Sequence, residues 1–134
     1  MTFEELKVGM EARYERRIDD VEIDEFARLS GDHNPLHISA EFARQAGFRN
    51  RVVHGALLAA LVSRLVGMEL PGRQSLLLSL KLDFPAPTFP NDTVVVVGQI
   101  GSLHPEERAI VLRLRVTCGE ETRARGSALV RVPS

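Results

Sequence analysis

A helix-forming stretch in the middle of the chain, residues 55–68, limits the possible folds more than any other feature. Its sequence, GALLAALVSRLVGM, is apolar on almost every side, and Pro71 and Gly72 end it. A helix of this kind must be covered on all sides. Its longest apolar run, ALLAALV, is too short to cross a bilayer, so we expect a buried helix at the centre of a soluble protein that has no membrane contact.

The part of the chain that follows this helix has the pattern of strands. We expect four, at residues 75–84, 93–103, 108–118 and 122–132. In the third, apolar residues alternate with Arg113 and Arg115, which is the period of a strand with one buried face. The turn sequences HPEE and GEE predict antiparallel hairpins, and the proline-rich PAPTFPND must lie outside any central strand.

The part before the central helix is mainly helical. Asp19 or Asp20 is a suitable cap for a helix that ends at Gly31. Pro35 prevents that helix from continuing. We expect a short first strand and a second short helix as well, at residues 11–18 and 39–47.

These elements favour one architecture. An antiparallel sheet with one apolar face has to be filled, and an apolar helix has to be covered. The economical solution is an α+β arrangement in which the sheet curls around the helix, the layout called the hotdog fold. No linker or repeat divides residues 1–134, so we expect a single domain. The sheet leaves a free edge and the helix leaves apolar surface, which together predict a homodimer.

Composition excludes several classes of function. The 17 basic and 18 acidic residues give a formal net charge of -1, and no basic block stands out, so we expect no nucleic-acid partner. The single cysteine, Cys118, excludes an intramolecular disulfide. The first ten residues are acidic and lack the apolar core of a signal peptide, and a cytoplasmic location is therefore expected.

The sequence GDHNPLH, residues 31–37, concentrates ionisable and amide groups in one stiff loop. A carboxylate and an imidazole that share a water molecule, here Asp32 and His37, suit general acid–base catalysis near neutral pH. Asn34 adds an amide that can hold the loop or a ligand. The spacing alone also fits an ordinary turn, because Asp32 is a plausible cap and Asn34-Pro35 a common turn dipeptide.

Metal binding and nucleophilic catalysis are less favoured. Asp32, His33, His37 and His54 include metal-ligating side chains, but no paired cysteines and no HExxH motif accompany them, so we expect no metal. No GxSxG sequence indicates an activated serine.

The stretch FARLSGDHNPLHISAEFA, residues 26–43, resembles the hydratase 2 motif of the MaoC-like (R)-specific enoyl-CoA hydratases. The similarity extends to VVHGALLAALVSRLVGMELPG and to KLDFPAPTFPNDTV, and so covers nearly the whole chain. His33 falls at a variable position of the motif.

The resemblance implies reversible addition of water to a trans-2-enoyl-CoA to give the (3R)-3-hydroxyacyl-CoA. It implies that Asp32 and His37 jointly hold the attacking water, without fixing which is base and which is acid. It also implies that the backbone N–H of Gly55, at the start of the central helix, stabilises the charge on the thioester oxygen. A glycine there also permits close packing against the sheet, which is the alternative interpretation.

Other residues have secondary roles in this hypothesis. Asn34 and Ser63 are candidate substrate-binding residues, although Ser63 can equally bond the preceding helical turn. His54 is expected to be a structural hydrogen-bonding residue. No cofactor is required, since coenzyme A is part of the substrate. Its phosphates need cationic groups, for which four candidates are Arg73, Lys81, Arg113 and Arg115.

Three rival functions stay open. The same residues running in reverse describe a dehydratase of acyl-carrier-protein thioesters. A hotdog thioesterase generally needs a carboxylate along the central helix, and residues 55–68 contain none. A domain that only binds acyl thioesters has little need of both Asp32 and His37. Chain length and pathway, whether polyhydroxyalkanoate storage polyester or fatty-acid breakdown, are not encoded in these motifs.

Overall fold

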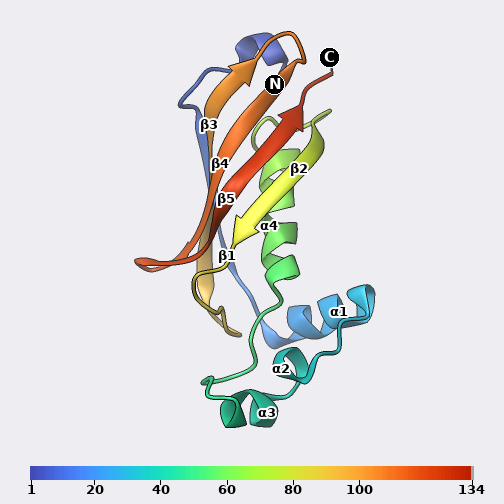
Figure 1. Cartoon of the computed structure of the whole chain (residues 1–134), viewed down its shortest axis with the longest axis vertical. Coiled ribbons are helices and arrows are strands. Elements are labelled where there is room, and N and C mark those ends of the chain that lie inside the picture. Colours follow the sequence, from blue (N-terminus) through green and yellow to red (C-terminus); the bar gives the residue numbers. More distant parts are fainter. Residues whose placement is uncertain (134) are drawn as a thin grey trace.

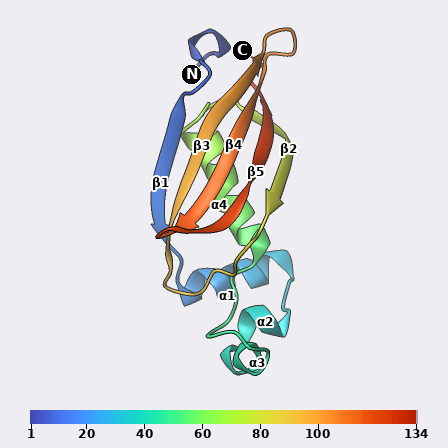
Figure 2. The same cartoon turned by 60° about the vertical axis from the view of Figure 1, so that its left-hand side comes forward.

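One antiparallel sheet of five strands, in the order β1-β3-β4-β5-β2, forms the body of the protein in a computed structural model that describes residues 1–133. Helix α4 runs along one face of this sheet (Figures 1 and 2). The elements in chain order are η1 (Phe3–Glu5), β1 (Glu11–Arg17), α1 (Asp20–Ser30), α2 (Pro35–Ile38), α3 (Ala40–Gln45), α4 (Gly55–Met68), β2 (Leu76–Asp83), β3 (Thr93–His104), β4 (Ala109–Cys118) and β5 (Glu121–Arg131).

The core lies between α4 and the inner face of the sheet. Leu58, Val62 and Leu65 of α4 are buried against inward-facing residues such as Leu112 and Val116. On β4 these alternate with exposed Arg113 and Arg115, as the period of two predicts.

Close approach of the helix to the sheet depends on a glycine. A Cβ atom at Gly98 of β3 would lie 2.6 Å from Cδ2 of Leu65, closer than carbon atoms pack. Glycine at this position therefore lets the Leu65 side chain reach the sheet.

The sheet of a single chain leaves one face of α4 uncovered, and coverage on all sides stays a prediction for the homodimer. Residues along its other face are exposed, namely Ala56, Ala60, Ser63, Arg64 and Gly67. The physical reason is that one sheet, however curved, covers only one side of a cylinder. Exposed apolar residues continue from this face to the neighbouring edge strand, where Met68, Leu76 and Leu78 are largely open to solvent.

The helices α1, α2 and α3 lie together beyond one end of the sheet, beside the N-terminus of α4 (Figures 1 and 2). Each begins at a side-chain cap. Asp19 accepts a hydrogen bond from the N–H of Glu22 and forms a capping box with it, and Gly31 ends α1 at a φ of 79°. The caps of α2 and α3 are Asn34 and Ser39.

Among residues 1–133, no helix combines the length and the apolar composition needed to span a bilayer.

Candidate active site

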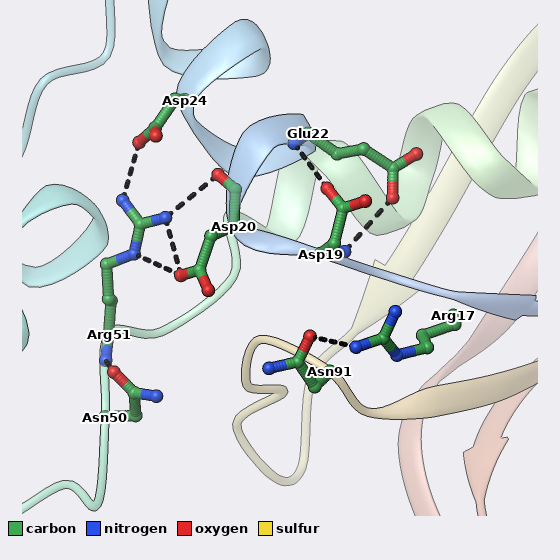
Figure 3. A network of polar contacts seen from close by, with 8 residues as sticks. All are labelled: Arg17, Asp19, Asp20, Glu22, Asp24, Asn50, Arg51 and Asn91. Carbon is green, nitrogen blue, oxygen red and sulfur yellow. Dashed lines mark hydrogen bonds and ion pairs between the residues drawn. The ribbon is translucent and has the colours of Figure 1, made fainter.

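The coil that joins α3 to α4, residues 51–54, connects the helical part of the molecule to the sheet. Its first residue, Arg51, is anchored on α1: the guanidinium donates to Oδ1 of Asp20 at 2.9 and 3.2 Å, to Oδ1 of Asp24 at 2.6 Å and to the Asp20 carbonyl at 2.9 Å (Figure 3). The Arg51 side chain is only 8 % exposed. Burial alone would lower its pKa, but the hydrogen bonds that Arg51 donates to Asp24 and Asp20 outweigh this and raise it, so Arg51 stays charged.

The next two residues of the coil join α2 and the loop after β2. The Val52 N–H donates to the Leu36 carbonyl at 3.0 Å, and the Val53 N–H donates to the Thr88 carbonyl at 2.8 Å. The Val52 carbonyl lies 2.7 Å from Nδ1 of His37. A carbonyl only accepts, so Nδ1 carries a proton, and in the neutral form of the ring Nε2 is the acceptor.

That Nε2 atom faces Asp32. The distance from His37 Nε2 to Asp32 Oδ2 is 3.7 Å, too long for a direct hydrogen bond and suited to a water molecule that contacts both groups. The other carboxylate oxygen, Oδ1, accepts a hydrogen bond from the N–H of Asn34 at 3.2 Å, which orients the carboxylate. Asp32 is 50 % exposed and His37 is 14 % exposed, so the pair lies at the border between solvent and protein.

His54 supports both residues of this pair. Its Nε2–H donates to the Asp32 carbonyl at 3.1 Å, and its ring stacks on the His37 ring at a centroid distance of 4.0 Å. The ring of Phe26 contacts the His54 ring edge to face, with a centroid distance of 5.0 Å. His54 is 1 % exposed, and burial lowers its pKa, which keeps the ring neutral near pH 7. The expected structural hydrogen bond is thus present.

A hollow of about 340 Å³ opens beside His37. Its walls include Val52, Gly55, Phe84 and Thr88. The N–H of Gly55 begins α4 and has no acceptor among residues 1–133. A Cβ at Gly55 would lie 3.1 Å from Cζ of Phe84, so the glycine also serves packing. Both interpretations of Gly55 therefore have a geometric basis.

The two predicted substrate-binding residues occupy different places. The Asn34 side chain accepts the N–H of Leu36 at 3.1 Å, so its oxygen is used in capping α2. Ser63 was expected inside a buried helix, and that expectation is wrong: its side chain is on the exposed face of α4 and does not line the hollow. Sequence periodicity does not tell which faces of an apolar helix a sheet will cover.

Three side chains of this site are of the types that bind metal ions and lie close enough together to hold one. Asp32, His37 and His54 each offer one ligand atom, all within 4.8 Å of one another. His33, the fourth ligand considered from the sequence, is exposed and lies outside the group. The absence of a metal stays a prediction.

Sequence reasoning missed Arg51, Val52 and Phe84. The available signal for Arg51 was the pair Asp20 and Asp24, which the helical period places on one face of α1. The Val52 contribution comes from its backbone carbonyl, and no side-chain pattern reports it.

Comparison with known proteins places this geometry in a family. The model of the MaoC like domain matches residues 3–119, most of the chain. The chain belongs to the MaoC-like family. An (R)-specific enoyl-CoA hydratase from Aeromonas caviae is 37% identical over 134 residues, which cover 99% of this chain and 100% of that protein. A mitochondrial 3-hydroxyacyl-[acyl-carrier-protein] dehydratase from Arabidopsis thaliana is 33% identical over 113 residues, 84% of this chain and 67% of that one.

A solved structure shows the same fold in this MaoC-like family. The (R)-hydratase from A. caviae involved in PHA biosynthesis superposes with a TM-score of 0.91 and 38% identity, over 96% of this chain and 98% of that one. The predicted hotdog fold and family are therefore confirmed. These relatives are named as hydratases and dehydratases, that is, hydro-lyases, which confirms the predicted enzyme class.

Proposed function

We propose that the protein is an (R)-specific enoyl-CoA hydratase that adds water to a trans-2-enoyl-CoA to give the (3R)-3-hydroxyacyl-CoA. The observation that carries this proposal is the pair of acceptors, Asp32 Oδ2 and His37 Nε2, 3.7 Å apart beside the Gly55 hollow. The sequence similarity to the A. caviae hydratase supports the choice of substrate.

The first part of the mechanism activates water. A water molecule held by Asp32 and His37 loses a proton to the pair while its oxygen bonds to Cβ of the enoyl thioester. The pair then returns one proton to Cα, so that one water is added across the double bond and no net proton is consumed. Because the two groups share the proton, acid and base roles belong to the pair.

The second part stabilises charge. As the new bond forms at Cβ, negative charge develops on the thioester oxygen. The N–H of Gly55 is a free donor at the positive end of α4, and a thioester seated in the hollow beside His37 would place its oxygen near that donor.

The proposal also covers assembly, location and cofactors. Addition of water is redox-neutral, so no cofactor is needed and dialysis against EDTA should leave activity unchanged. The exposed face of α4 and the free edge of β2 favour a homodimer, which light scattering after size exclusion would detect. We infer a cytoplasmic location from the single cysteine, Cys118, which fits a reducing compartment.

The decisive experiment follows the loss of enoyl-thioester absorbance with crotonyl-CoA, together with chiral analysis of the product. Formation of the (3R) alcohol supports the proposal, and release of free thiol would instead indicate a thioesterase.

A second candidate, dehydration of 3-hydroxyacyl-carrier-protein thioesters, is favoured by the similarity to the Arabidopsis enzyme. Comparison of kcat/KM on matched CoA and carrier-protein substrates separates the two.

A further inference from the structure

A second hollow, of about 610 Å³, lies on the face of the sheet that is turned away from α4. Figure 2 shows this outer face toward the viewer, and within residues 1–133 no helix packs over it. The charged residues that line the hollow are Glu11, Asp83, Arg113, Arg115 and Arg125. It therefore differs from the Gly55 hollow in both position and chemistry.

The arginines occupy the middle of the hollow. Arg113 and Arg115 alternate with buried residues on β4, and Arg125 on β5 is the direct cross-strand partner of Arg115. Like charges directly opposite each other destabilise a sheet. No carboxylate within residues 1–133 forms an ion pair with any of the three, whereas the buried Arg51 and Arg123 each have two carboxylate partners.

The carboxylates of the hollow lie on the edge strands. Asp83 is on β2 directly opposite Arg125, and its ion pair, at 3.9 Å from Oδ2 to Nζ, is with Lys81 and not with Arg125; Glu11 is on β1. Positive charge is thus concentrated over β4 and β5, although the whole chain has a net charge of -1. An overall basic composition does not explain this concentration.

We propose that the outer hollow is a binding site for a polyphosphorylated ligand, held by Arg115 and Arg125 together, with Arg113 beside them. The planar guanidinium groups match phosphate oxygens in a bidentate manner, and an anion between them removes their mutual repulsion.

Two sources of this chemistry can be distinguished, the nucleotide end of a coenzyme A substrate and a separate nucleotide. Asp83 lines the outer hollow and the next residue, Phe84, lines the hollow beside His37, so the end of β2 contributes to both hollows. Assignment to coenzyme A rests on the proposed function, whereas binding of phosphate itself does not.

The first test uses inorganic pyrophosphate as the probe, in isothermal titration calorimetry and thermal unfolding of the full chain. The unaltered protein should bind it and unfold at a higher temperature in its presence. Arg115→Gln and Arg125→Gln should each weaken binding about tenfold or more, because each removes charge-assisted hydrogen bonds. The matched control is Arg131→Gln, on the same strand but outside the hollow, and it should bind as the unaltered protein does.

Three outcomes overturn the site: no binding at millimolar pyrophosphate, equal weakening by Arg131→Gln, or full binding by an Arg115→Lys/Arg125→Lys double variant. The last would show that bulk charge, and not the guanidinium geometry, attracts the anion. Arg115 and Arg125 are exposed, so each glutamine variant should change the free energy of unfolding by less than about 0.5 kcal/mol, and thermal unfolding without pyrophosphate checks that the variants are folded.

The second test identifies the source. The KM values of the Arg115→Gln/Arg125→Gln variant are measured for crotonyl-CoA and for crotonyl-pantetheine, which lacks the nucleotide. If only the KM for crotonyl-CoA rises, the site belongs to the substrate. An unchanged KM for both assigns it to a separate phosphorylated ligand. If the unaltered protein does not hydrate crotonyl-CoA, the proposed function fails. The pyrophosphate titration still decides whether the outer hollow binds phosphate.

Discussion

The sheet with α4 and the helical segment before it are held together by different forces. The large, fully buried side chains lie mainly between α4 and the sheet, with Leu58, Leu65 and Leu112 among them. In α1, α2 and α3 together only Ile23, Ala27 and Ala43 are buried hydrophobics.

Polar contacts take the place of a core in the helical segment. The caps, the Arg51 ion pairs and the backbone bonds of residues 51–54 fix its position against α4. Hydrophobic burial therefore supplies most of the stability, whereas directional hydrogen bonds define the Asp32–His37 geometry. Substitutions in the two regions should separate stability from catalysis.

The largest effect is expected at the proposed catalytic pair, Asp32 and His37. Asp32→Asn and His37→Gln should each lower kcat for crotonyl-CoA hydration by about 10²- to 10⁴-fold, because each removes one of the two acceptors that hold the water. Both residues lie outside the core, so thermal unfolding should change little. His33→Gln, in the same loop but exposed, is the control and should retain activity. Near-normal hydration by either variant would refute the assignment of the pair.

The next effect tests the core. Leu65→Ala should lower the free energy of unfolding by about 2–5 kcal/mol, because it leaves a cavity between α4 and β3. The molecules that remain folded should keep their kcat. Leu29→Ala makes the same truncation at a side chain that is 76 % exposed, and should change the free energy of unfolding by less than about 0.5 kcal/mol. If Leu65→Ala lowered kcat in folded protein as strongly as His37→Gln does, the two regions would not be separable.

Sequence reasoning predicted the apolar half of the fold well. The bounds of α4 agree with the prediction, and the predicted strands differ from β2 to β5 by one residue at most at each end. Alternation of apolar residues and the turns at HPEE and GEE are local signals, so they can be read along the chain. The helix α2 was missed, since Asn34-Pro35 predicts a turn and also, as observed, a capped helix with proline in its first turn.

The polar contacts of the helical segment and the candidate site were predicted less completely than the core. Asp32 and His37 could be paired from the sequence because they lie close together in it, and the structure places the two side chains 3.7 Å apart; their catalytic role stays a prediction. Arg51 was not found, because its partners Asp20 and Asp24 are 31 and 27 residues away. Contacts of this range depend on how the helices pack, which a periodic pattern does not specify.

Arg51 should affect catalysis through the coil it anchors. Arg51→Met frees the segment whose Val52 carbonyl orients His37, and kcat should fall about tenfold or more with little change in KM. Asp20 and Asp24 are exposed enough to stay hydrated, so the loss of stability should be about 1–2 kcal/mol.

The matched control for Arg51 is Arg108→Met, which removes an ion pair with Glu4 far from the site. It should leave kcat unchanged. Arg51→Lys keeps the charge and should recover part of the activity. A rise in KM with constant kcat would place Arg51 in substrate binding and not in positioning His37.

The smallest expected effect is the pH dependence that His54 gives to stability. Its pKa in the folded protein lies below the ordinary value of 6.5 because the ring is buried. Below about pH 6.5 the unfolded chain therefore binds a proton that the folded chain does not, and the free energy of unfolding falls as the pH decreases toward the folded-state pKa. Urea unfolding from pH 7.5 to 5 should show this fall in the unaltered protein and a smaller one in His54→Gln, whereas His104→Gln, at an exposed histidine at the end of β3, should behave as the unaltered protein does. Equal pH dependence in all three would mean that His54 takes up its proton as readily in the folded protein as in the unfolded chain, and would refute the effect of burial on its pKa.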